Sequence, residues 1–165
     1  MKITVGIPAY NEEKNIAKII VKLKKVADQV IVCDDGSTDS THAIAESLGV
    51  TVIKHPKNSG YGMAIRSIFL KAREINADIL VTLDADGQHK IEDINKIIKP
   101  VADGQADISI GSRFLKADDN TPGYRKFGVK VITKVTNSSL SEKVTDAQSG
   151  FRAYNNKVLQ SLTPS

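Results

Sequence analysis

The segment Asp84-Ala85-Asp86-Gly87-Gln88-His89 holds the residue types with the clearest capacity for chemistry. It follows an apolar run at 78–83, so its two carboxylates are expected at the C-terminal end of a buried strand, where both can point into one cleft. Carboxylate oxygens are good ligands for Mg²⁺ or Mn²⁺, and such a cation usually accompanies phosphates. Acidic residues before a glycine are also common in turns, so the pattern alone leaves an ordinary turn as the alternative.

The surrounding elements predict where this segment lies. Short β-branched runs alternate with segments whose apolar residues recur at helical spacing, and Asn11 is the expected N-cap of the first helix. This order predicts a single α/β domain with a mostly parallel central sheet and helices on both faces. The expected strands cover 2–7, 29–33, 51–53, 78–83 and 106–111, and helices are expected up to Val26, around 43–48, around 65–72 after a loop at 55–62, from 91 to 101, from 124 to 136 and from 155 to 162.

The ends of these strands carry the polar residues. Pro8–Glu12, Asp34–Asp39 and Asp84–His89 each follow a predicted strand directly. In a parallel sheet the loops at the carboxyl ends of the strands line the ligand crevice, so these three segments should converge there. The sequence therefore places its polar clusters where a nucleotide would bind.

Composition limits the classes of protein. The chain of 165 residues has a net charge of +4, but its 23 basic residues are mixed with 19 acidic ones, aromatic residues make up 5% and tryptophan is absent. This argues against a nucleic-acid partner. Cys33 is the single cysteine, which excludes an internal disulfide, and we expect a buried thiol. Neither a signal-peptide pattern nor an apolar run of ~18 residues occurs, so a cytoplasmic chain, at most lying against a membrane surface, is expected.

Three classes of nucleotide-binding enzyme do not fit. A P-loop phosphotransferase needs Gly-x-x-x-x-Gly-Lys-Ser/Thr, which does not occur. A dinucleotide-binding dehydrogenase needs Gly-x-Gly-x-x-Gly after the first strand, where this chain has Gly6-Ile7-Pro8-Ala9-Tyr10-Asn11. The glycine- and basic-rich phosphate loop of a sugar nucleotidyltransferase is also missing. Transfer from a nucleotide-bound donor, whose diphosphate a metal neutralises, is the chemistry that remains.

A set of motifs in register carries a family resemblance. Together they resemble family 2 glycosyltransferases of the Rossmann-like GT-A fold, and most closely the polyprenyl-phosphate (dolichol-phosphate) mannose or glucose synthases. The resemblance covers nearly the whole chain. The motifs are Pro8-Ala9-Tyr10-Asn11-Glu12, Asp34-Asp35-Gly36-Ser37-x-Asp39, Asn58-x-Gly60-x-Gly62-x-Ala64, Asp84-Ala85-Asp86-Gly87-Gln88, Gly111-Ser112-Arg113-Phe114 and Asp146-Ala147-Gln148-Ser149-Gly150-Phe151-Arg152.

The resemblance implies roles on the donor side. Glu12 and Asp35 would accept hydrogen bonds from the base or ribose, although Glu12 also suits a helix N-terminus and the loop at 34–39 also suits a capped turn. Asp84 would face the donor, and Asp86 with Gln88 would hold the metal beside it, while His89 lies outside the site. The residues implied in donor nucleotide binding are Pro8, Tyr10, Glu12, Asp35, Asp84, Ala85 and Asp86, and those implied in holding Mg²⁺ or Mn²⁺ are Asp84, Asp86 and Gln88.

On the acceptor side the resemblance implies arginines. A phosphate acceptor is already a competent nucleophile, and guanidinium groups steer it against the negative charge of the donor. Arg113, Arg125 and Arg152 are the candidates, with Arg113 counted as catalytic beside Asp84 and Asp86. Asp146 is either structural or, for a sugar hydroxyl acceptor, a general base. The helix at 124–136, with its lysines four residues apart, is either a membrane-surface helix or an ordinary amphipathic one.

The resemblance thus implies an inverting, Mg²⁺- or Mn²⁺-dependent enzyme that moves a hexose, mannose or glucose, from GDP-mannose or UDP-glucose to a polyprenyl or dolichyl phosphate. Its expected location is peripheral, at the cytoplasmic face of the membrane. A transferase to a sugar hydroxyl and a non-catalytic module that binds nucleotide sugars are the alternatives. The chain of 165 residues is shorter than the usual catalytic domain of the family, so residues 1–165 are expected to be one catalytic domain truncated at its C-terminus.

Overall fold

The computed structural model describes residues 1–86, 91–111 and 149–161. Within these ranges six strands form one sheet in the order β3-β2-β1-β4-β6-β5. The strands are β1 (Ile3–Ala9), β2 (Gln29–Asp34), β3 (Thr51–Lys54), β4 (Ile79–Thr82), β5 (Ile108–Ile110) and β6 (Arg152–Asn155). The helices are α1 (Ile16–Leu23), α2 (Thr41–Ser47), α3 (Tyr61–Glu74), the 3₁₀ turn η1 (Ile91–Asp93), α4 (Ile94–Ala102) and α6 (Asn156–Ser161).

The sheet is mostly parallel, which confirms the predicted fold class. β1 pairs in parallel with both β2 and β4, and β2 pairs in parallel with β3. The exception is β6, which runs antiparallel between β4 and β5 and was missed from the sequence. Its residues Ala153 and Tyr154 point to opposite sides of the sheet, and both are buried. The segment therefore lacks the alternation of apolar and polar residues by which a strand with one exposed side is recognised.

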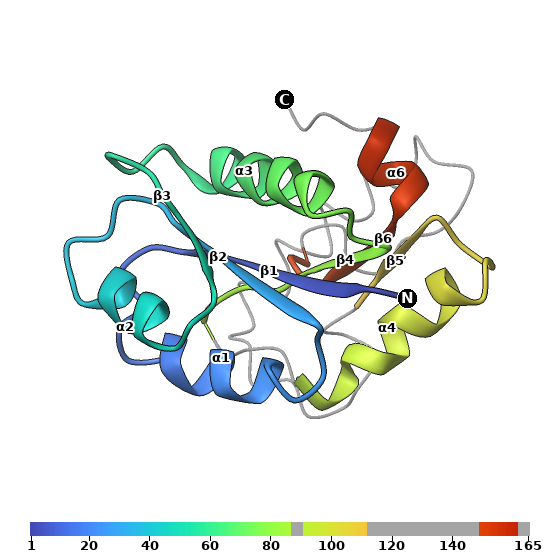
Figure 1. Ribbon diagram of the computed structural model, residues 1–165, viewed down its shortest axis with the longest axis horizontal. Helices are drawn as coiled ribbons and strands as arrows, with labels where there is room; N and C mark the ends of the chain where they lie inside the picture. The colour runs from blue at the N-terminus through green and yellow to red at the C-terminus, as the bar shows by residue number, and fades with distance from the viewer. Residues whose placement is uncertain (87–90, 112–148, 162–165) are drawn as a thin grey trace, which may run out of the picture.

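Helices cover both faces of the sheet (Figure 1). On one side α1, α2 and α4 enclose a core that includes Val5 and Ile7 of β1, and on the other side α3 and α6 enclose a second core around Ile68 and Leu80. Gly6 faces α3, and a Cβ at this position would collide with the side chain of Ile68. The glycine therefore allows α3 to lie directly on β1, which brings the start of this helix to the end of the central strand.

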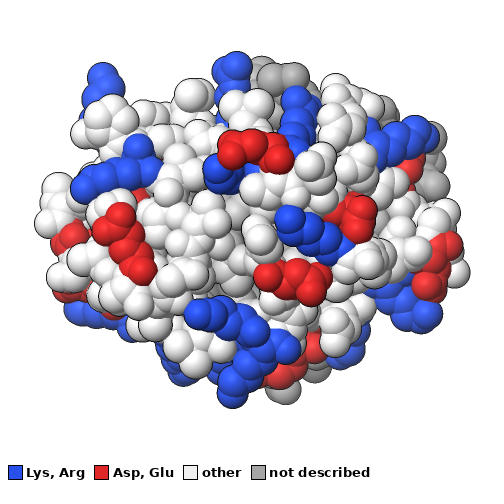
Figure 2. Space-filling view, in the orientation of Figure 1, with Lys and Arg blue, Asp and Glu red and all other residues white. Residues whose placement is uncertain are grey.

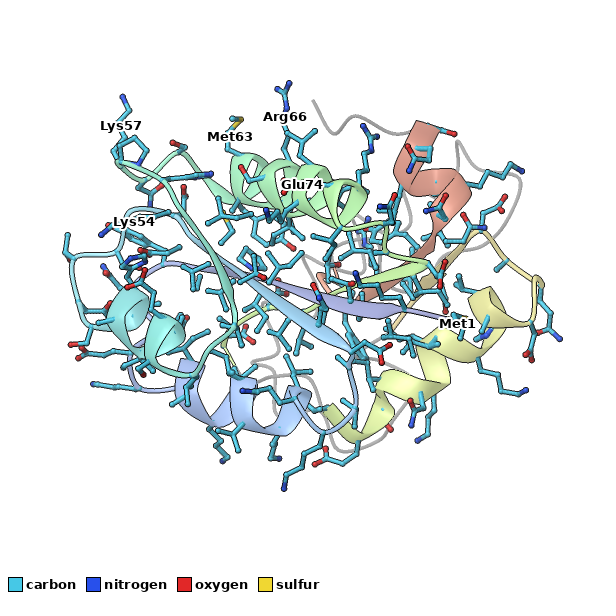
Figure 3. The ribbon with its side chains drawn as sticks, viewed as in Figure 1. Met1, Lys54, Lys57, Met63, Arg66 and Glu74 are labelled. Carbon is cyan, nitrogen blue, oxygen red and sulfur yellow. The ribbon has the colours of Figure 1, made fainter. Side chains whose placement is uncertain are left out.

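The outer side of α3 faces away from the sheet. Figure 3 shows Met63 and Arg66 projecting outward from this helix, while Ala64 and Ile68 are buried beneath it. On the face seen in Figure 2, acidic and basic side chains are interspersed. Among the helices of the described ranges, none has the length and apolar character needed to cross a membrane.

The first helix begins later than predicted, and Asn11 is not its N-cap. α1 begins at Ile16 with Asn15 at the cap position, and Asn11 instead adopts a left-handed conformation with φ 55°. The side-chain oxygen of Asn11 accepts a hydrogen bond of 2.9 Å from the backbone N–H of Thr38, and its own N–H donates to the hydroxyl of Ser37. Asn11 thus fastens the loop after β1 to the loop after β2, and this contact between distant segments replaces the local cap.

Candidate active site

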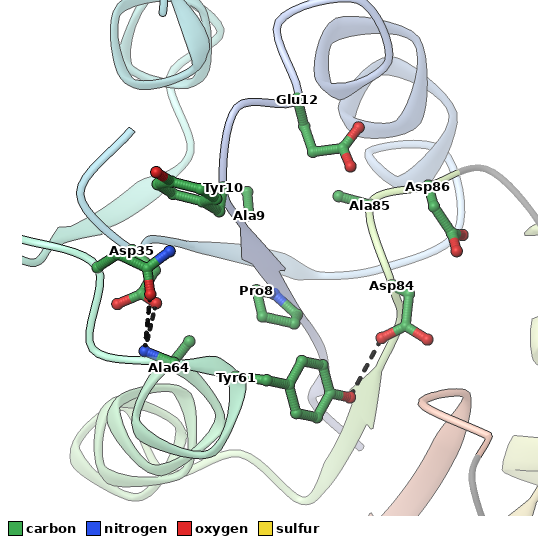
Figure 4. Close-up of a pocket in the computed structure, with 12 residues that line it drawn as sticks. Pro8, Ala9, Tyr10, Glu12, Asp35, Tyr61, Ala64, Asp84, Ala85 and Asp86 are labelled. Atoms are coloured by element: carbon green, nitrogen blue, oxygen red, sulfur yellow. Dashed lines mark hydrogen bonds between the residues drawn. The ribbon is translucent and has the colours of Figure 1, made fainter. Parts of the chain in front are cut away.

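A cavity of about 560 Å³ lies at the carboxyl ends of β1, β2 and β4 (Figure 4). Every residue predicted to bind the donor nucleotide lines it. Parallel strands end at one edge of the sheet, so the three loops that follow them meet there, as the strand order requires. The lining residues are Pro8, Ala9, Tyr10, Glu12, Asp35, Asn58, Gly60, Tyr61, Ala64, Asp84, Ala85 and Asp86.

The loop at 34–39 divides its acidic residues between two tasks. Asp34 and Asp39 cap turns, because their carboxylates accept hydrogen bonds from the backbone N–H groups of Ser37 and Thr41. Asp35 points to the other side and lines the cavity. The capped-turn interpretation of this loop is therefore confirmed for Asp34 and Asp39, whereas Asp35 lies in the cavity lining, where a binding role would require it.

Asp35 is a strongly held carboxylate. Its Oδ1 accepts hydrogen bonds from His55 Nδ1 at 2.6 Å and from the backbone N–H of Ser59 at 3.0 Å, and its Oδ2 accepts one from the N–H of Gly60 at 2.8 Å. Burial by itself raises the pKa of Asp35, but these hydrogen bonds outweigh burial and lower the pKa below its ordinary value of 3.8. Asp35 is thus a fixed negative charge at neutral pH.

Glu12 lines the cavity from the segment that follows β1, whereas Asp35 lines it from the loop after β2 (Figure 4). Its N–H donates to the hydroxyl of Thr41 at 2.8 Å, and its carboxylate accepts from the side-chain amide of Asn15 at 2.9 Å. The alternative that Glu12 is a charge in the first turn of a helix is wrong, since that turn of α1 contains no acidic residue. Glu12 instead offers carboxylate oxygen at the cavity wall.

Asp84 is held by groups from distant parts of the chain. The hydroxyl of Tyr61, at the start of α3, donates to Asp84 Oδ1 at 3.1 Å (Figure 4). The backbone of Gly150 lies so close that a Cβ there would collide with the Asp84 carboxylate, and the Gly150 carbonyl accepts a bond of 2.7 Å from Thr82. Although 54% of the Tyr61 surface is exposed, burial of its hydroxyl, followed by the charge of Asp84, raises the pKa of Tyr61. Tyr61 therefore acts as a neutral donor to Asp84.

The donor set at the end of β4 fits a hard divalent cation in its chemistry. Asp84 and Asp86 both line the cavity and supply carboxylate oxygens, the ligand type that Mg²⁺ and Mn²⁺ prefer. No group of three His, Cys, Asp or Glu residues among the described residues could hold a metal by itself. Two carboxylates are nevertheless what Mg²⁺ commonly takes from a protein when substrate phosphates supply further oxygens. The third predicted ligand, Gln88, lies outside the described residues, as does His89.

Of the predicted acceptor residues, only Arg152 falls within the described ranges. It lies on β6, where its Nε donates to the carbonyl of Ser149 at 2.8 Å, and it is not among the residues that line the cavity. The charge of Arg152 lowers the pKa of Tyr61, but burial and Asp84 raise that pKa by more. Arg113, Arg125, Asp146 and the predicted helix at 124–136 lie outside the described residues.

No role was predicted from the sequence for the segment from Asn58 to Ala64. In the structure Asn58, Gly60, Tyr61 and Ala64 all line the cavity. The signal was present in the motif Asn58-x-Gly60-x-Gly62-x-Ala64, which follows the third strand just as the assigned loops follow theirs. This segment forms the wall between Asp35 and Asp84, because Gly60 contacts the first carboxylate and Tyr61 the second.

The chain is an α/β protein with a cavity at the carboxyl ends of its parallel strands, the place where open α/β sheets bind their ligands. The chain belongs to the Glycosyl transferase family 2, whose model matches residues 4–163. The resemblance drawn from the motifs is thereby confirmed.

Relatives of known name support the same grouping. The chain is 37% identical to the UDP-N-acetylglucosamine–dolichyl-phosphate N-acetylglucosaminyltransferase of Methanococcus voltae, over 95% of this chain and 70% of the relative. It is 33% identical to the dolichol-phosphate mannosyltransferase of Pyrococcus furiosus, over 98% of this chain but 48% of the relative. The polyprenol monophosphomannose synthase of Mycolicibacterium smegmatis is 32% identical, with 96% and 63% covered. The chain thus spans about half to 70% of the length of these relatives.

Solved structures agree on the fold. The glucosyl-3-phosphoglycerate synthase of Mycobacterium tuberculosis, in complex with Mn²⁺ and UDP-glucose, superposes with a TM-score of 0.75 at 25% identity, over 98% of this chain and 58% of that one. The same enzyme with Mn²⁺, UDP and glucosyl-3-phosphoglycerate gives a TM-score of 0.75 at 24% identity, with 98% and 59% covered. The architecture is that of a GT-A glycosyltransferase.

Proposed function

We propose that this chain transfers a sugar from a nucleoside diphosphate donor to a polyprenyl or dolichyl phosphate, with the help of Mg²⁺ or Mn²⁺. The observation that carries the proposal is one cavity that unites the held carboxylate Asp35 with the carboxylate pair Asp84 and Asp86. Membership of the family supports sugar transfer, and the names of the relatives from Methanococcus voltae and Pyrococcus furiosus support a lipid phosphate as the acceptor.

The cavity suits a nucleoside diphosphate at both ends. Asp35 and Glu12 offer carboxylate oxygens that accept hydrogen bonds from N–H or O–H groups of a base or ribose. Asp84 and Asp86, with Gln88, would hold the divalent cation, which would offset the negative charge that develops on the departing diphosphate. The carboxylates alone would repel a diphosphate, so donor binding should require the metal.

A phosphate acceptor fits the residues of this chain better than a hydroxyl acceptor. A phosphate monoester needs no general base, and among the residues that the structure describes, the cavity lining contains none besides the carboxylates assigned to the donor. Arg113, Arg125 and Arg152 would bind the acceptor phosphate and counter its repulsion from the donor. The basic helix at 124–136 would bring the site to a membrane surface.

The donor is GDP-mannose or UDP-glucose in this proposal, and the Methanococcus voltae relative adds UDP-N-acetylglucosamine to the donors worth testing. Isothermal titration of each donor, with Mn²⁺ and after chelation, should give metal-dependent binding of one of them. Asp86→Ala should weaken that binding by roughly 10–100-fold, as expected for loss of a metal-site group.

Asp103→Ala is the matched control, because Asp103 forms an exposed ion pair with Lys99 on the surface of α4, at 2.7 Å. This variant should bind the donor as the wild type does.

The bound donor should then transfer its sugar to polyprenyl phosphate in detergent. Asp146→Asn should leave that transfer nearly intact, whereas loss of a general base costs roughly 10²–10⁴ in rate. If no donor binds, or if binding ignores both metal and Asp86→Ala, the proposal fails.

A further inference from the structure

His55 contacts the cavity carboxylate Asp35 from behind without lining the cavity itself. It follows β3, its side chain is only 13% exposed, and its Nδ1 lies 2.6 Å from Asp35 Oδ1. Its second ring nitrogen, Nε2, lies 2.8 Å from the hydroxyl of Ser67 on α3. The ring therefore connects the strand layer to the helix layer directly beneath one end of the cavity.

The chemistry of the partners fixes the proton on the ring. An ionised carboxylate can only accept, so Nδ1 of His55 must carry the hydrogen that it donates to Asp35. In the neutral ring Nε2 is then an acceptor for the Ser67 hydroxyl. The buried Cys33 has its sulfur 3.6 Å from Nε2, and burial, followed by the charges of Asp35 and Asp34, raises the pKa of its thiol to about 12. No negative charge on Cys33 therefore competes for the ring near neutral pH.

The hydrogen bonds of Asp35 also determine which of its oxygens is left for a ligand. Among the described residues, Oδ1 accepts two hydrogen bonds, from His55 and Ser59, whereas Oδ2 accepts one, from Gly60. A carboxylate oxygen has two lone pairs, so the remaining capacity lies on Oδ2. Rotation of the carboxylate away from this arrangement would break the bond to His55.

The neighbouring aspartate provides a comparison within the same chain. Asp34 also lies beside a histidine, with its Oδ2 3.5 Å from His42 Nδ1, but neither residue lines the cavity. His42 sits on α2, on the opposite side of the sheet from α3, and its Nε2 faces Glu46 at 3.3 Å. The two aspartate–histidine pairs thus differ in two ways: only Asp35 reaches the cavity, and only Asp35 is hydrogen-bonded to its histidine, since among the described residues Asp34 Oδ2 and His42 Nδ1 have no hydrogen-bond partner.

We propose that His55 is a positioning residue for nucleoside recognition: held by Ser67, its imidazole directs Asp35 Oδ2 toward an N–H or O–H donor on the base or ribose of a bound nucleoside diphosphate. The inference rests on the proposed function and names the end of the cavity where the nucleoside lies. In this proposal His55 affects the binding of the nucleoside only, and the carboxylates at the end of β4 serve the diphosphate.

Two substitutions of His55 separate its two nitrogens. The amide nitrogen of His55→Asn takes about the place of Nδ1 and can still donate to Asp35, whereas that of His55→Gln takes about the place of Nε2 and cannot. Titration with UDP and GDP in the presence of Mn²⁺ should show roughly 10–100-fold weaker binding for His55→Gln, the cost of losing a hydrogen bond to a charged group. His55→Asn should stay within about threefold of the wild type.

Inorganic pyrophosphate with Mn²⁺ is the probe that has no nucleoside. Its affinity should be the same, within about twofold, in the wild type and both His55 variants, because the hydrogen bond from His55 orients a carboxylate that faces the nucleoside alone. His42→Gln is the matched control and should leave both affinities unchanged. In a transfer assay, His55→Gln should raise the KM of the donor and leave kcat nearly unchanged, as for loss of uniform binding.

The possible outcomes are distinct. Three results would each overturn the role of His55. The first is that His55→Gln binds nucleoside diphosphates as strongly as the wild type. The others are an equal loss of this affinity in His55→Asn and His55→Gln, and a parallel loss of pyrophosphate binding. If His55→Gln does not fold, Ser67→Ala replaces it, and this variant should weaken UDP or GDP binding by about threefold without affecting pyrophosphate. A wild type that binds neither UDP nor GDP would overturn the proposed function as well.

Discussion

The hydroxyl of Tyr61 ties the start of α3 to the carboxylate at the end of β4. Its bond to Asp84 Oδ1 is 3.1 Å long, and Gly150 closes the other side of the same carboxylate. Asp84 thus has a restricted orientation before any ligand arrives, and ligand groups that meet a preoriented carboxylate lose less entropy on binding.

Replacement of Tyr61 by phenylalanine removes this bond and keeps the ring at the cavity wall. A hydrogen bond to a charged group contributes about 1.5–3 kcal/mol, so Tyr61→Phe should weaken Mn²⁺-dependent binding of a nucleoside diphosphate by roughly tenfold or more. Asp103→Ala is the control and should leave this binding unchanged, because Asp103 forms an exposed ion pair with Lys99 and does not line the cavity. Equal affinities for Tyr61→Phe and the wild type in titration calorimetry would show that Asp84 needs no such support.

At the residue scale, the sequence predicted the cavity residues that directly follow β1, β2 and β4. Tyr10, Asp35 and Asp84 belong to loops whose position follows from the rule for parallel sheets, and motif spacing singled them out. Tyr61 and His55 were not predicted. Each acts through a partner 20 or more positions away, Asp84 for Tyr61 and Asp35 for His55, so no local pattern reveals the pairing.

At the scale of the elements, Asp39 joins the beginnings of α1 and α2. Its carboxylate accepts hydrogen bonds from the N–H and the hydroxyl of Thr41 in α2, and from the N–H of Glu13 in the turn before α1. Burial opposes the charged form, but these bonds together outweigh it and lower the pKa of Asp39 below 3.8. Because the pKa is lower in the folded state, the ionised carboxylate stabilises the fold.

Asp39→Ala should therefore lower the free energy of unfolding by about 1 kcal/mol near neutral pH. A depressed folded pKa gives stability that is fully present above the ordinary pKa of 3.8 and is lost as the pH falls through the folded value. Urea unfolding at several pH values should show a constant difference between wild type and variant above about pH 5 and a shrinking one below about pH 4. A difference that grows toward low pH would contradict this account, and Asp103→Ala, at an exposed ion pair, should show little difference.

The elements with long apolar patterns were the ones the sequence predicted well. α3 was expected around 65–72, after a loop through Gly62, and is found at Tyr61–Glu74. α4 was expected at 91–101 and is found at Ile94–Ala102, preceded by a 3₁₀ turn. β6 was missed because it is only four residues long and its two central residues, Ala153 and Tyr154, are buried on opposite sides of the sheet. The start of α1 was misplaced because Asn11 satisfies its polar groups on Ser37 and Thr38 across a loop, which competes with a local cap.

At the scale of the whole molecule, the sheet order is what the sequence could not supply. Alternating strands and helices predict a parallel sheet, but they do not state that β1 lies between β2 and β4, or that β6 separates β4 from β5. This order places Gly150 against Asp84 across more than sixty positions of chain. The cavity is thus built from segments that meet only when most of the sheet has formed, so the cavity is present only when the sheet is folded.

Binding at this cavity should therefore stabilise the entire sheet rather than a local loop. A ligand at 100 times its Kd adds about 2.7 kcal/mol to the free energy of unfolding. For a chain of 165 residues, each kcal/mol raises Tm by about 2–4 °C, so a saturating nucleoside diphosphate with Mn²⁺ should raise Tm by about 5–10 °C. The melting curve should stay a single transition, because loops from β1, β2 and β4 are all held by the same ligand. Chelation of the metal should abolish the shift, and Asp86→Ala should reduce it. If calorimetry shows binding while the main transition stays in place, the cavity loops unfold independently of the sheet, and the cooperative connection inferred from the strand order is wrong.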